Sequence, residues 1–276
     1  MEAAEVERRV LEAVGRAMGR FAMLRPGDRV AVGVSGGKDS LCLLHVLAAH
    51  RRRTPFPYEL VAVTLEQGKF TRPIRSIEGQ IRALGIPWVL LEDRRTLRLV
   101  TDGIVHGCDV CSRHRRGWLY RAAGEAGCNV LALGHTADDC AEALLRNILF
   151  NGRIASLPPV AASRKGGLRL IRPLALASEA LTAEYARVHG LEAVGCVCSD
   201  KESVRAEIRD FLAGLGARHP GVRESILAAL ANVHPHALFA VAALAPPPGV
   251  RQDEPASAPA ARGGRQAGSR RDVQDD

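Results

Sequence analysis

Aromatic residues are scarce in this chain, at 4% of its 276 residues. The hydrophobic fraction is nevertheless 47%, so a core can form, but it must be built mainly from Leu, Val, Ile and Ala. A chain of this length can bury a sizeable core in one large α/β domain or in two smaller ones. The composition therefore predicts a protein that folds over most of its length around aliphatic side chains.

Long apolar runs are also missing. The longest candidate, residues 226–245, is interrupted by His234, Pro235 and His236. The N-terminal residues MEAAEVERRV are acidic and lack the apolar region of a secretory signal. We therefore expect a cytoplasmic protein with no membrane partner. In that compartment its seven cysteines are expected to be thiols or metal ligands rather than disulfides.

Positive charge is in excess, and arginine supplies nearly all of it. The chain has 38 basic and 30 acidic residues, a net charge of +8. From Pro246 onward five arginines balance five acids, so the whole excess belongs to residues 1–245. A basic, arginine-rich body suits a polyanionic partner such as a nucleic acid. Arginine-rich codon usage in a GC-rich genome is the alternative explanation.

Apolar strand patterns alternate with helical patterns along the body. Strands are predicted at 29–34, 60–65, 88–92, 129–134 and 168–174, and helices at 3–24, 39–50, 74–84, 112–126, 137–150, 178–189, 201–215 and 220–243. Continuous apolar strands between helices predict an α/β fold, a Rossmann-like parallel sheet with helices on both faces. We divide the chain into an N-terminal helix (1–27), a nucleotide-binding domain with a helical C-terminal part (28–245) and a disordered tail (246–276).

The sequence SGGKDS, residues 35–40, follows the first predicted strand. Ligands of an open parallel sheet bind at the carboxyl ends of its strands. Gly36 and Gly37 would let the backbone approach a ligand and adopt positive φ. The next helix, beginning near Asp39, would point free N–H groups and its positive dipole end at the same place. With the side chains of Ser35, Lys38 and Ser40 as further donors, this loop is predicted to bind an anion.

The loop is not a Walker A motif, since Asp39 follows Lys38 where Ser or Thr is required. A carboxylate beside a phosphate would repel it unless a cation such as Mg²⁺ lies between them. The alternative is a tight strand-to-helix turn in which Asp39 is an ordinary acid of the first helical turn.

Five segments together resemble a known family. SGGKDS resembles the pyrophosphate loop (PP-loop) of the adenine nucleotide α-hydrolase-like ATP pyrophosphatases, which have a HUP/Rossmann-like fold. LGHTADD (133–139) and CDVCSRHRRG (108–117) are similar to segments of the family's tRNA 2-thiolation branch. IRPL (171–174) and NVHPHAL (232–238) resemble its 2-thiocytidine (TtcA-type) subgroup. The resemblance spans residues 10–240. It implies an enzyme that uses ATP to adenylate the C2 carbonyl of a tRNA pyrimidine and then transfers sulfur to that carbon.

Two groups of cysteines point to a metal. Cys108 and Cys111 form a CxxC, and Cys196 and Cys198 form a CxC well downstream. Two such groups in a cytosolic protein indicate a shared metal. The resemblance implies a [4Fe-4S] cluster on Cys108, Cys111 and Cys196, with one iron open for sulfide. Cys198 is the alternative third ligand because the family's PCxxCG is here GCVCS, and a four-thiolate zinc site is also open. We expect the other cysteines to be core residues: Cys42, Cys128 and Cys140.

His135, Asp138 and Asp139 follow the strand at 129–134 and should reach the same sheet edge as the glycine loop. They could also be turn residues, with Asp138 as a helix cap. The resemblance implies that they line the ATP and substrate pocket. We expect Asp138 to act on Mg²⁺ or in proton transfer, together with Lys38 and Asp39 as catalytic residues. The resemblance also implies adenosine contacts from the backbone of Val63 and beside Gly134.

Arg113, Arg115 and Arg116 crowd one helical turn after the CxxC. A run of charge is usually a solvated face, but this one borders the predicted cluster and ATP edge. We expect it to bind tRNA phosphates, consistent with an exposed anticodon-loop cytidine as substrate. The sulfur donor would be a cysteine desulfurase or free sulfide, and a homodimer is the candidate assembly.

Three other functions compete with 2-thiocytidine synthesis. A uridine-thiolating enzyme of the same branch would usually carry additional zinc-binding Cys/His modules. A PP-loop amidotransferase or lysidine-type synthetase would leave the four cysteines without a role. A nucleotide-binding sensor without turnover would not exchange pyrophosphate into ATP.

Overall fold

The computed structural model describes most of the chain. The described residues are 2–67, 70–93, 98, 108–162, 167–195, 204–234 and 238–239, with the backbone alone for 108–115. The chain divides into two units, Met1–Ala231 and Asn232–Asp276, and all the secondary structure reported below belongs to the first. The domain boundaries expected from the sequence stay a prediction.

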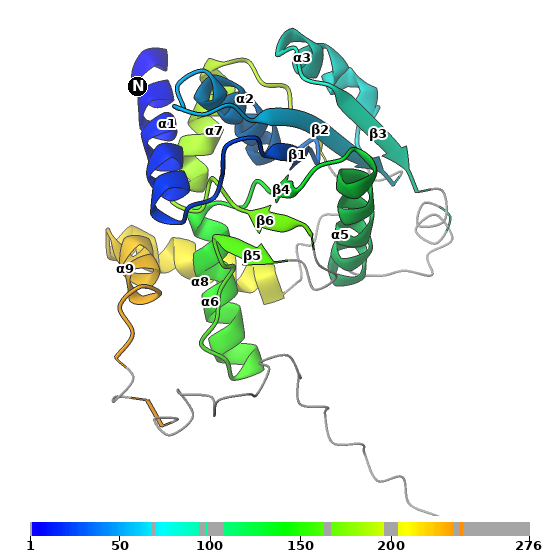
Figure 1. Ribbon diagram of the computed structural model, residues 1–276. Coiled ribbons are helices and arrows are strands. Elements are labelled where there is room, and N and C mark those ends of the chain that lie inside the picture. Colours follow the sequence, from blue (N-terminus) through cyan, green and yellow to red (C-terminus); the bar gives the residue numbers. More distant parts are fainter. Residues whose placement is uncertain are drawn as a thin grey trace, which may run out of the picture. The chain divides into compact units, whose positions relative to one another are not determined.

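A six-stranded sheet organises the first unit (Figure 1). Its strands are β1 (Arg29–Gly33), β2 (Glu59–Glu66), β3 (Trp88–Glu92), β4 (Val130–Ala132), β5 (Val160–Ala162) and β6 (Arg169–Ile171), in the order β3-β2-β1-β4-β6-β5. The first four neighbouring pairs are parallel, and only β5 runs antiparallel, against β6. The prediction of a Rossmann-like parallel sheet is confirmed, except that the edge strand β5 is antiparallel.

Helices connect the strands. They are α1 (Ala3–Arg20), α2 (Lys38–Arg51), α3 (Glu78–Ala83), α5 (Cys108–Glu125), α6 (Ala137–Asn151), α7 (Glu179–Val188), α8 (Val204–Arg218) and α9 (Val222–Ala229), with a 3₁₀ turn, η1, at Ile74–Ile77. No helix in the described part of the chain is long and apolar enough to cross a membrane.

Three local features differ from the sequence-based prediction. The edge strand β5 was not expected, because three partly exposed residues after Pro158 and Pro159 carry no strand pattern. Helix α5 begins at Cys108 rather than 112, so the CxxC lies in its first turn rather than ahead of it. The helix predicted over 220–243 was wrong in extent, since α9 ends at Ala229 and residues 232–234 are not helical. The proline at 235 disfavours helical backbone just before it.

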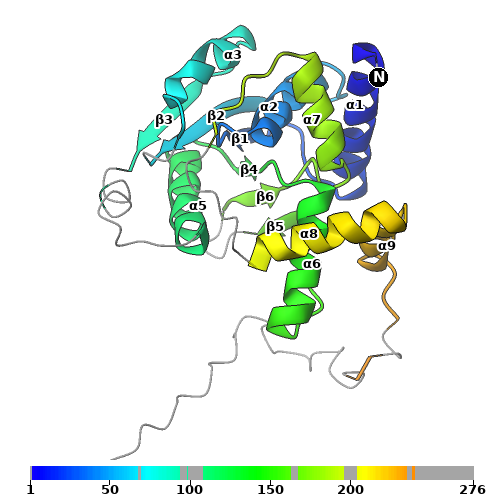
Figure 2. The same cartoon turned by 180° about the vertical axis from the view of Figure 1, so that it is seen from behind.

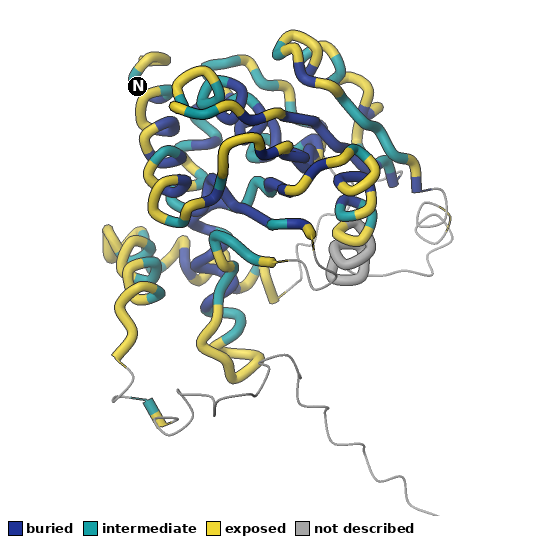
Figure 3. The backbone as a smooth tube through the Cα atoms, viewed as in Figure 1, coloured by how far each residue is buried: buried dark blue, intermediate teal, exposed yellow. Residues whose placement is uncertain are grey.

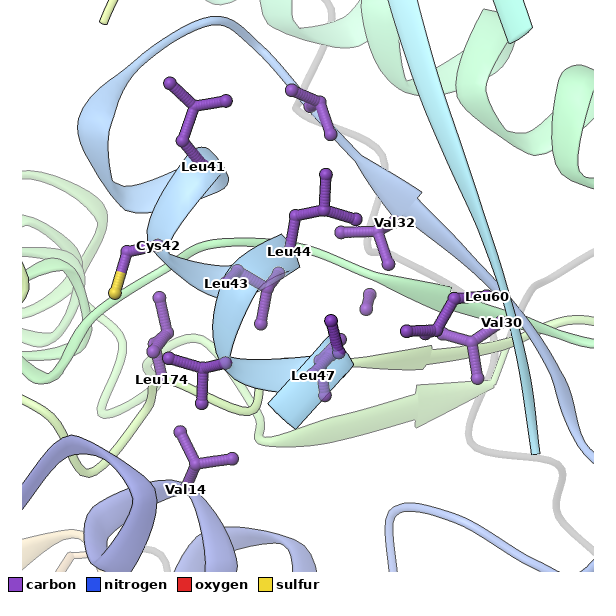
Figure 4. Packing of buried hydrophobic residues seen from close by; sticks show 14 of the residues in the cluster. Val14, Val30, Val32, Leu41, Cys42, Leu43, Leu44, Leu47, Leu60 and Leu174 are labelled. Atoms are coloured by element: carbon purple, nitrogen blue, oxygen red, sulfur yellow. The ribbon is translucent and has the colours of Figure 1, made fainter. Parts of the chain in front are cut away.

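The sheet separates two aliphatic cores, and Figure 3 shows the central strands buried along most of their length. The larger core joins alternate residues of β1 and β2 to α1, α2 and α7. Figure 4 shows its centre, where Leu43, Leu44 and Leu47 of α2 lie over Val30 and Val32 of β1. The smaller core packs Leu119 and the following turn of α5 against the other face of the strands. Figure 2 shows α2 and α7 together from behind, apart from α5.

Candidate active site at the carboxyl edge of the sheet

The glycine loop leaves β1 with its backbone closely packed. Gly36 has φ +78°, and a Cβ there would lie 3.0 Å from Cδ1 of Ile74 and 3.3 Å from Cβ of Val194. The Val194 N–H also donates to the Gly36 carbonyl at 2.7 Å. Only glycine fits this position without strain. Gly37 instead has φ −75°, so the expectation of positive φ was right for Gly36 and wrong for Gly37.

Serine hydroxyls organise the inside of the loop. The buried Ser40 hydroxyl accepts from the Ser35 N–H at 3.1 Å and donates to the Gly37 carbonyl at 2.8 Å. Ser35 is exposed, and its hydroxyl lies 3.2 Å from that of Ser40. Ser40 therefore holds the turn in shape, while Ser35 remains accessible to a ligand.

A lysine between two carboxylates marks the start of α2. The Lys38 ammonium lies 2.9 Å from Asp39 Oδ2 and 2.7 Å from Glu179 Oε1. Burial acts to lower the pKa of Lys38, but the hydrogen bonds and charges of Glu179 and Asp39 together raise the pKa above its ordinary value. The ammonium is therefore charged at neutral pH. Thr182 donates to the other oxygen of Asp39 at 2.5 Å.

Glu179 is a site residue that the sequence did not reveal. It is the first residue of α7, far from SGGKDS in the chain, and its local pattern is that of an ordinary acid in a first helical turn. Only the packing of α7 against α2 brings its carboxylate to Lys38.

The segment LGHTADD caps α6 and continues the site. Thr136 is the N-cap, and it forms a capping box with Asp139. The cap is therefore Thr136, not Asp138. The buried carboxylate of Asp138 instead accepts the N–H of Glu179 at 2.6 Å and pairs with Arg223 of α9. Asp138 thus reaches the N-terminus of α7, beside the carboxylate that holds Lys38.

Two arginines of α8 neutralise the remaining acids of α6. Arg205 pairs with Asp139 and, at 3.1 Å, with the buried carboxylate of Glu142. Arg209 binds the other oxygen of Glu142, also at 3.1 Å. These ion pairs fix α8 against α6 and use up the positive charge of these two side chains.

Gly134 brings the two loops together. A Cβ at this position would lie 3.1 Å from the carbonyl carbon and oxygen of Asp39 and from the amide nitrogen of Ser40. The backbone after β4 therefore touches the start of α2, and His135 follows directly. The predicted convergence of SGGKDS and LGHTADD at one edge is what the structure shows, although contacts of Gly134 and His135 with a nucleotide stay predictions.

Val63 lies inside β2, which continues to Glu66. Its side chain is buried in the smaller core, and its carbonyl accepts the N–H of Val34 at 2.8 Å. That carbonyl is thus already bonded within the sheet. A contact between the Val63 backbone and adenosine stays a prediction.

The backbone of helix α5 is oriented with its N-terminal end, where the CxxC lies, toward the same edge on the other face of the sheet. Its C-terminal half leads to β4 at the amino edge, so its N-terminal end points toward the carboxyl edge. Leu119 packs near the end of β1, since a Cβ on Gly33 would lie 3.5 Å from its Cδ1. Cys108 is eleven positions earlier, about 16 Å further along a helix.

The chemistry of the cysteines fits the predicted cluster. Cys108 and Cys111 are three residues apart in one helical turn, so they share a helix face. Their side chains, and Cys196 and Cys198 altogether, lie outside the described residues. The other three cysteines are buried core residues, as predicted: Cys42, Cys128 and Cys140. Burial raises the pKa of each of these thiols, to about 11 for Cys140, which disfavours ligation by them.

The predicted RNA-binding arginines also begin on α5. Arg116 is exposed on that helix, and Arg113 and Arg115 belong to it through their backbone. Their side chains lie outside the described residues, so their contact with tRNA stays a prediction.

A mostly parallel sheet, a glycine loop leading into α2 and a second acidic loop after β4 define an ATP-binding α/β domain of the pyrophosphatase type. The chain matches the PP-loop domain over residues 4–213 and belongs to that family.

Within this family, the chain is similar to proteins with a more specific name. The chain is 41% identical over 239 residues to a tRNA-cytidine(32) 2-sulfurtransferase of Anaeromyxobacter sp. (strain K), covering 85% of this chain and 82% of the relative. It is 38% identical over 240 residues to the protein of that name from Sorangium cellulosum, covering 85% and 84%. Among solved structures, the U34-tRNA thiolase NcsA from Methanococcus maripaludis with its [4Fe-4S] cluster matches with a TM-score of 0.66 and 26% identity, covering 82% of this chain and 78% of that one.

Proposed function

We propose that this protein is an ATP-dependent tRNA sulfurtransferase that converts a cytidine of the anticodon loop, at position 32, to 2-thiocytidine. One observation carries the proposal. The glycine loop and the acidic loop touch at Gly134, and the chain aligns over 85% of its length with a tRNA-cytidine(32) 2-sulfurtransferase.

The glycine loop would bind the ATP that activates the cytidine base. The exposed hydroxyl of Ser35 and the backbone of Gly36 and Gly37 would bind pyrophosphate, and Lys38 would add a charged ammonium beside them. The C2 carbonyl oxygen of cytidine attacks the α-phosphorus of ATP, and pyrophosphate leaves. Lys38 and the N-terminus of α2 stabilise the charge that develops on pyrophosphate.

Asp39 is the carboxylate that would hold Mg²⁺ beside the phosphates, since it is partly exposed and oxygen ligands suit this ion. Asp138, buried under the N-terminus of α7, is placed to set the position of Glu179 and through it of Lys38. We therefore assign Asp138 a positioning role in addition to the catalytic one expected from the sequence.

Cys108, Cys111 and Cys196, or Cys198 as the alternative third ligand, would hold the [4Fe-4S] cluster, which would supply the sulfur as sulfide. Sulfide would add to C2 of the adenylated base, and AMP would leave with the former carbonyl oxygen. The CxxC end of α5 and the glycine loop approach one edge from opposite faces of the sheet, so the activated base would lie between them. The sulfur donor would be free sulfide, or a cysteine desulfurase whose persulfide is reduced to sulfide by two electrons from an external thiol.

The test is reconstitution with defined RNA. Anaerobically purified protein is analysed for iron and sulfide, then incubated with ATP, sulfide and an unmodified tRNA transcript. We expect 2-thiocytidine in the digested RNA by mass spectrometry, and none from a transcript with uridine at position 32. Product at U34 instead would favour the activity named for the M. maripaludis structure, and a colourless, zinc-loaded protein would contradict the mechanism of sulfur transfer.

A further inference from the structure

Arg172 is a buried arginine that the function proposed above does not use. It follows β6 directly and is only 4% exposed. Its backbone N–H donates to the Pro159 carbonyl at 2.9 Å, and one terminal nitrogen donates to the Pro158 carbonyl. Its Nε is buried and has no hydrogen-bond partner. No ion pair joins Arg172 to a carboxylate within the described part of the chain.

A buried guanidinium without a carboxylate is unfavourable unless an anion binds to it. A guanidinium stays charged in proteins, and a buried charge without a counter-charge costs free energy. Burial is the main cause that lowers the pKa of Arg172. Arg116 lowers it further, whereas Cys140, Tyr120 and Asp139 act to raise it without offsetting the burial. Arg169, three residues earlier on the same strand, shows the usual solution, since it pairs with the buried Asp28. Among the described residues, Arg172 has no such carboxylate partner.

Arg172 lies between the helix that carries the CxxC and the helix that follows the acidic loop. Leu170 belongs to the core under α5 and Ile171 to the core under α2, so alternation along the strand directs Arg172 to the α5 face. Arg116 and Tyr120 of α5 and Asp139 and Cys140 of α6 are near enough to shift the pKa of Arg172. The side chain therefore lies between the CxxC helix and the start of α6.

The distance between Arg172 and the glycine loop is also short enough for both to contact one nucleotide. β6 is next to β4, and β4 is next to β1, which carries the glycine loop. Neighbouring strands are about 4.8 Å apart, so β6 lies about 10 Å from β1. One nucleotide can span such a gap.

We propose that Arg172 binds a phosphate group at the reaction centre, through its free Nε and its second terminal nitrogen. This rests on the function proposed above. The phosphate is either the α-phosphate of ATP, which becomes AMP, or the backbone phosphate of the target nucleotide. A planar guanidinium binds either one through two parallel hydrogen bonds, which a lysine cannot reproduce. Binding would supply the missing counter-charge and hold the activated base facing the CxxC helix.

The experiment compares R172K and R172M with R169K. Arg169 is the matched control because it is an arginine of the same strand that already has its carboxylate. For each protein we would measure affinity for AMP, for pyrophosphate and for unmodified tRNA, the rate of 2-thiocytidine formation, and the midpoint of thermal unfolding.

We expect both Arg172 variants to lose at least tenfold in thiolation rate and R169K to lose less than twofold. If the affinity of the Arg172 variants for AMP falls together with their thiolation rate, the ligand is the α-phosphate. If tRNA affinity falls and its salt dependence weakens by about one phosphate contact, the ligand is the backbone phosphate. Pyrophosphate affinity should not change in either case.

A merely structural arginine would give a different result. In that case R172K would lower the unfolding midpoint and leave both affinities and the rate per folded molecule within twofold of wild type, which would overturn the proposal. Wild-type protein that thiolates no tRNA would instead contradict the proposed function itself.

Discussion

At the scale of single residues, the site depends on close backbone approaches and on one lysine. Gly134 and Gly36 are required because a Cβ would meet backbone or packed side chains, whereas many other glycines of the chain have open space around them. Lys38 is placed by two carboxylates from different helices. A ligand phosphate would therefore meet a cation that is already oriented.

Gly134→Ala should separate the two loops. The new Cβ would lie 3.1 Å from the backbone of Asp39 and Ser40, which cannot move aside like a flexible side chain. We expect a loss of about 1–3 kcal/mol in the free energy of unfolding and at least tenfold weaker ATP binding. Denaturant unfolding and equilibrium binding measure these effects. Gly15→Ala, inside α1 with nothing within 4 Å, is the control and should be neutral or stabilising. Normal ATP affinity in Gly134→Ala would contradict the proposed site.

Lys38→Met should stop ATP cleavage without unfolding the protein. The ion pairs of Lys38 are partly exposed and contribute little to stability, about 0–1 kcal/mol. We expect at least a tenfold loss in tRNA-dependent pyrophosphate release, with a nearly unchanged unfolding midpoint. Arg8→Met removes an exposed cation paired with Glu5 and Glu12 on α1 and should keep full activity. Equal rates for the two variants would exclude Lys38 from catalysis.

At the scale of elements, helix termini gather the site. The starts of α2, α6 and α7 lie together because Gly134, Asp138 and Glu179 link them. Helix α8 adds two arginines that neutralise Glu142 and Asp139, so it stabilises α6 and does not offer those charges to a ligand.

Thr136→Ala tests the geometry of α6. The substitution removes the side-chain half of the capping box and should cost about 1 kcal/mol of stability. Because Asp138 and Gly134 flank this cap, ATP affinity should fall as well. Thr136→Ser keeps the hydroxyl and should restore both quantities. If Thr136→Ala loses stability but binds ATP as well as wild type, the cap does not control the site.

At the scale of the whole molecule, the sheet separates the elements that carry the two proposed activities. Helices α2 and α7, next to the glycine loop, pack on one face, and α5, whose first turn carries the CxxC, packs on the other. We therefore expect the proposed activation and sulfur transfer to meet at the carboxyl edge, where ligands of parallel sheets bind.

Cys108→Ala should uncouple these activities. We expect loss of iron and of 2-thiocytidine formation, with ATP affinity within twofold of wild type, measured by metal analysis, nucleoside mass spectrometry and equilibrium binding. Cys128→Ala changes a buried thiol of the core and should retain iron. Thiolation by Cys108→Ala would show that the cluster assignment is wrong.

Global stability should fall as the pH drops below about 6.5. Burial lowers the pKa of His45 and of His50 in the folded state. At a pH below the pKa of an unfolded histidine, these two imidazoles are protonated in the unfolded chain but remain largely neutral in the folded protein. Acid therefore favours unfolding. Urea unfolding at pH 7.5 and 5.5 measures the difference, and His45→Gln should reduce it. An unchanged difference in that variant would show that other groups cause the acid sensitivity.

The sequence by itself determined the alternation of strands and helices, the glycine loop, the acidic loop and the cysteine spacing. These depend on local chemistry: apolar runs, glycines and ligand types close together in the chain. The tertiary structure decided what no local pattern contains. It placed Glu179 against Lys38, gave the cap of α6 to Thr136, added the edge strand β5 and left the Nε of the buried Arg172 without a hydrogen-bond partner among the described residues. Each of these is set by packing between segments distant in sequence, where burial and charge are fixed only once the sheet has formed.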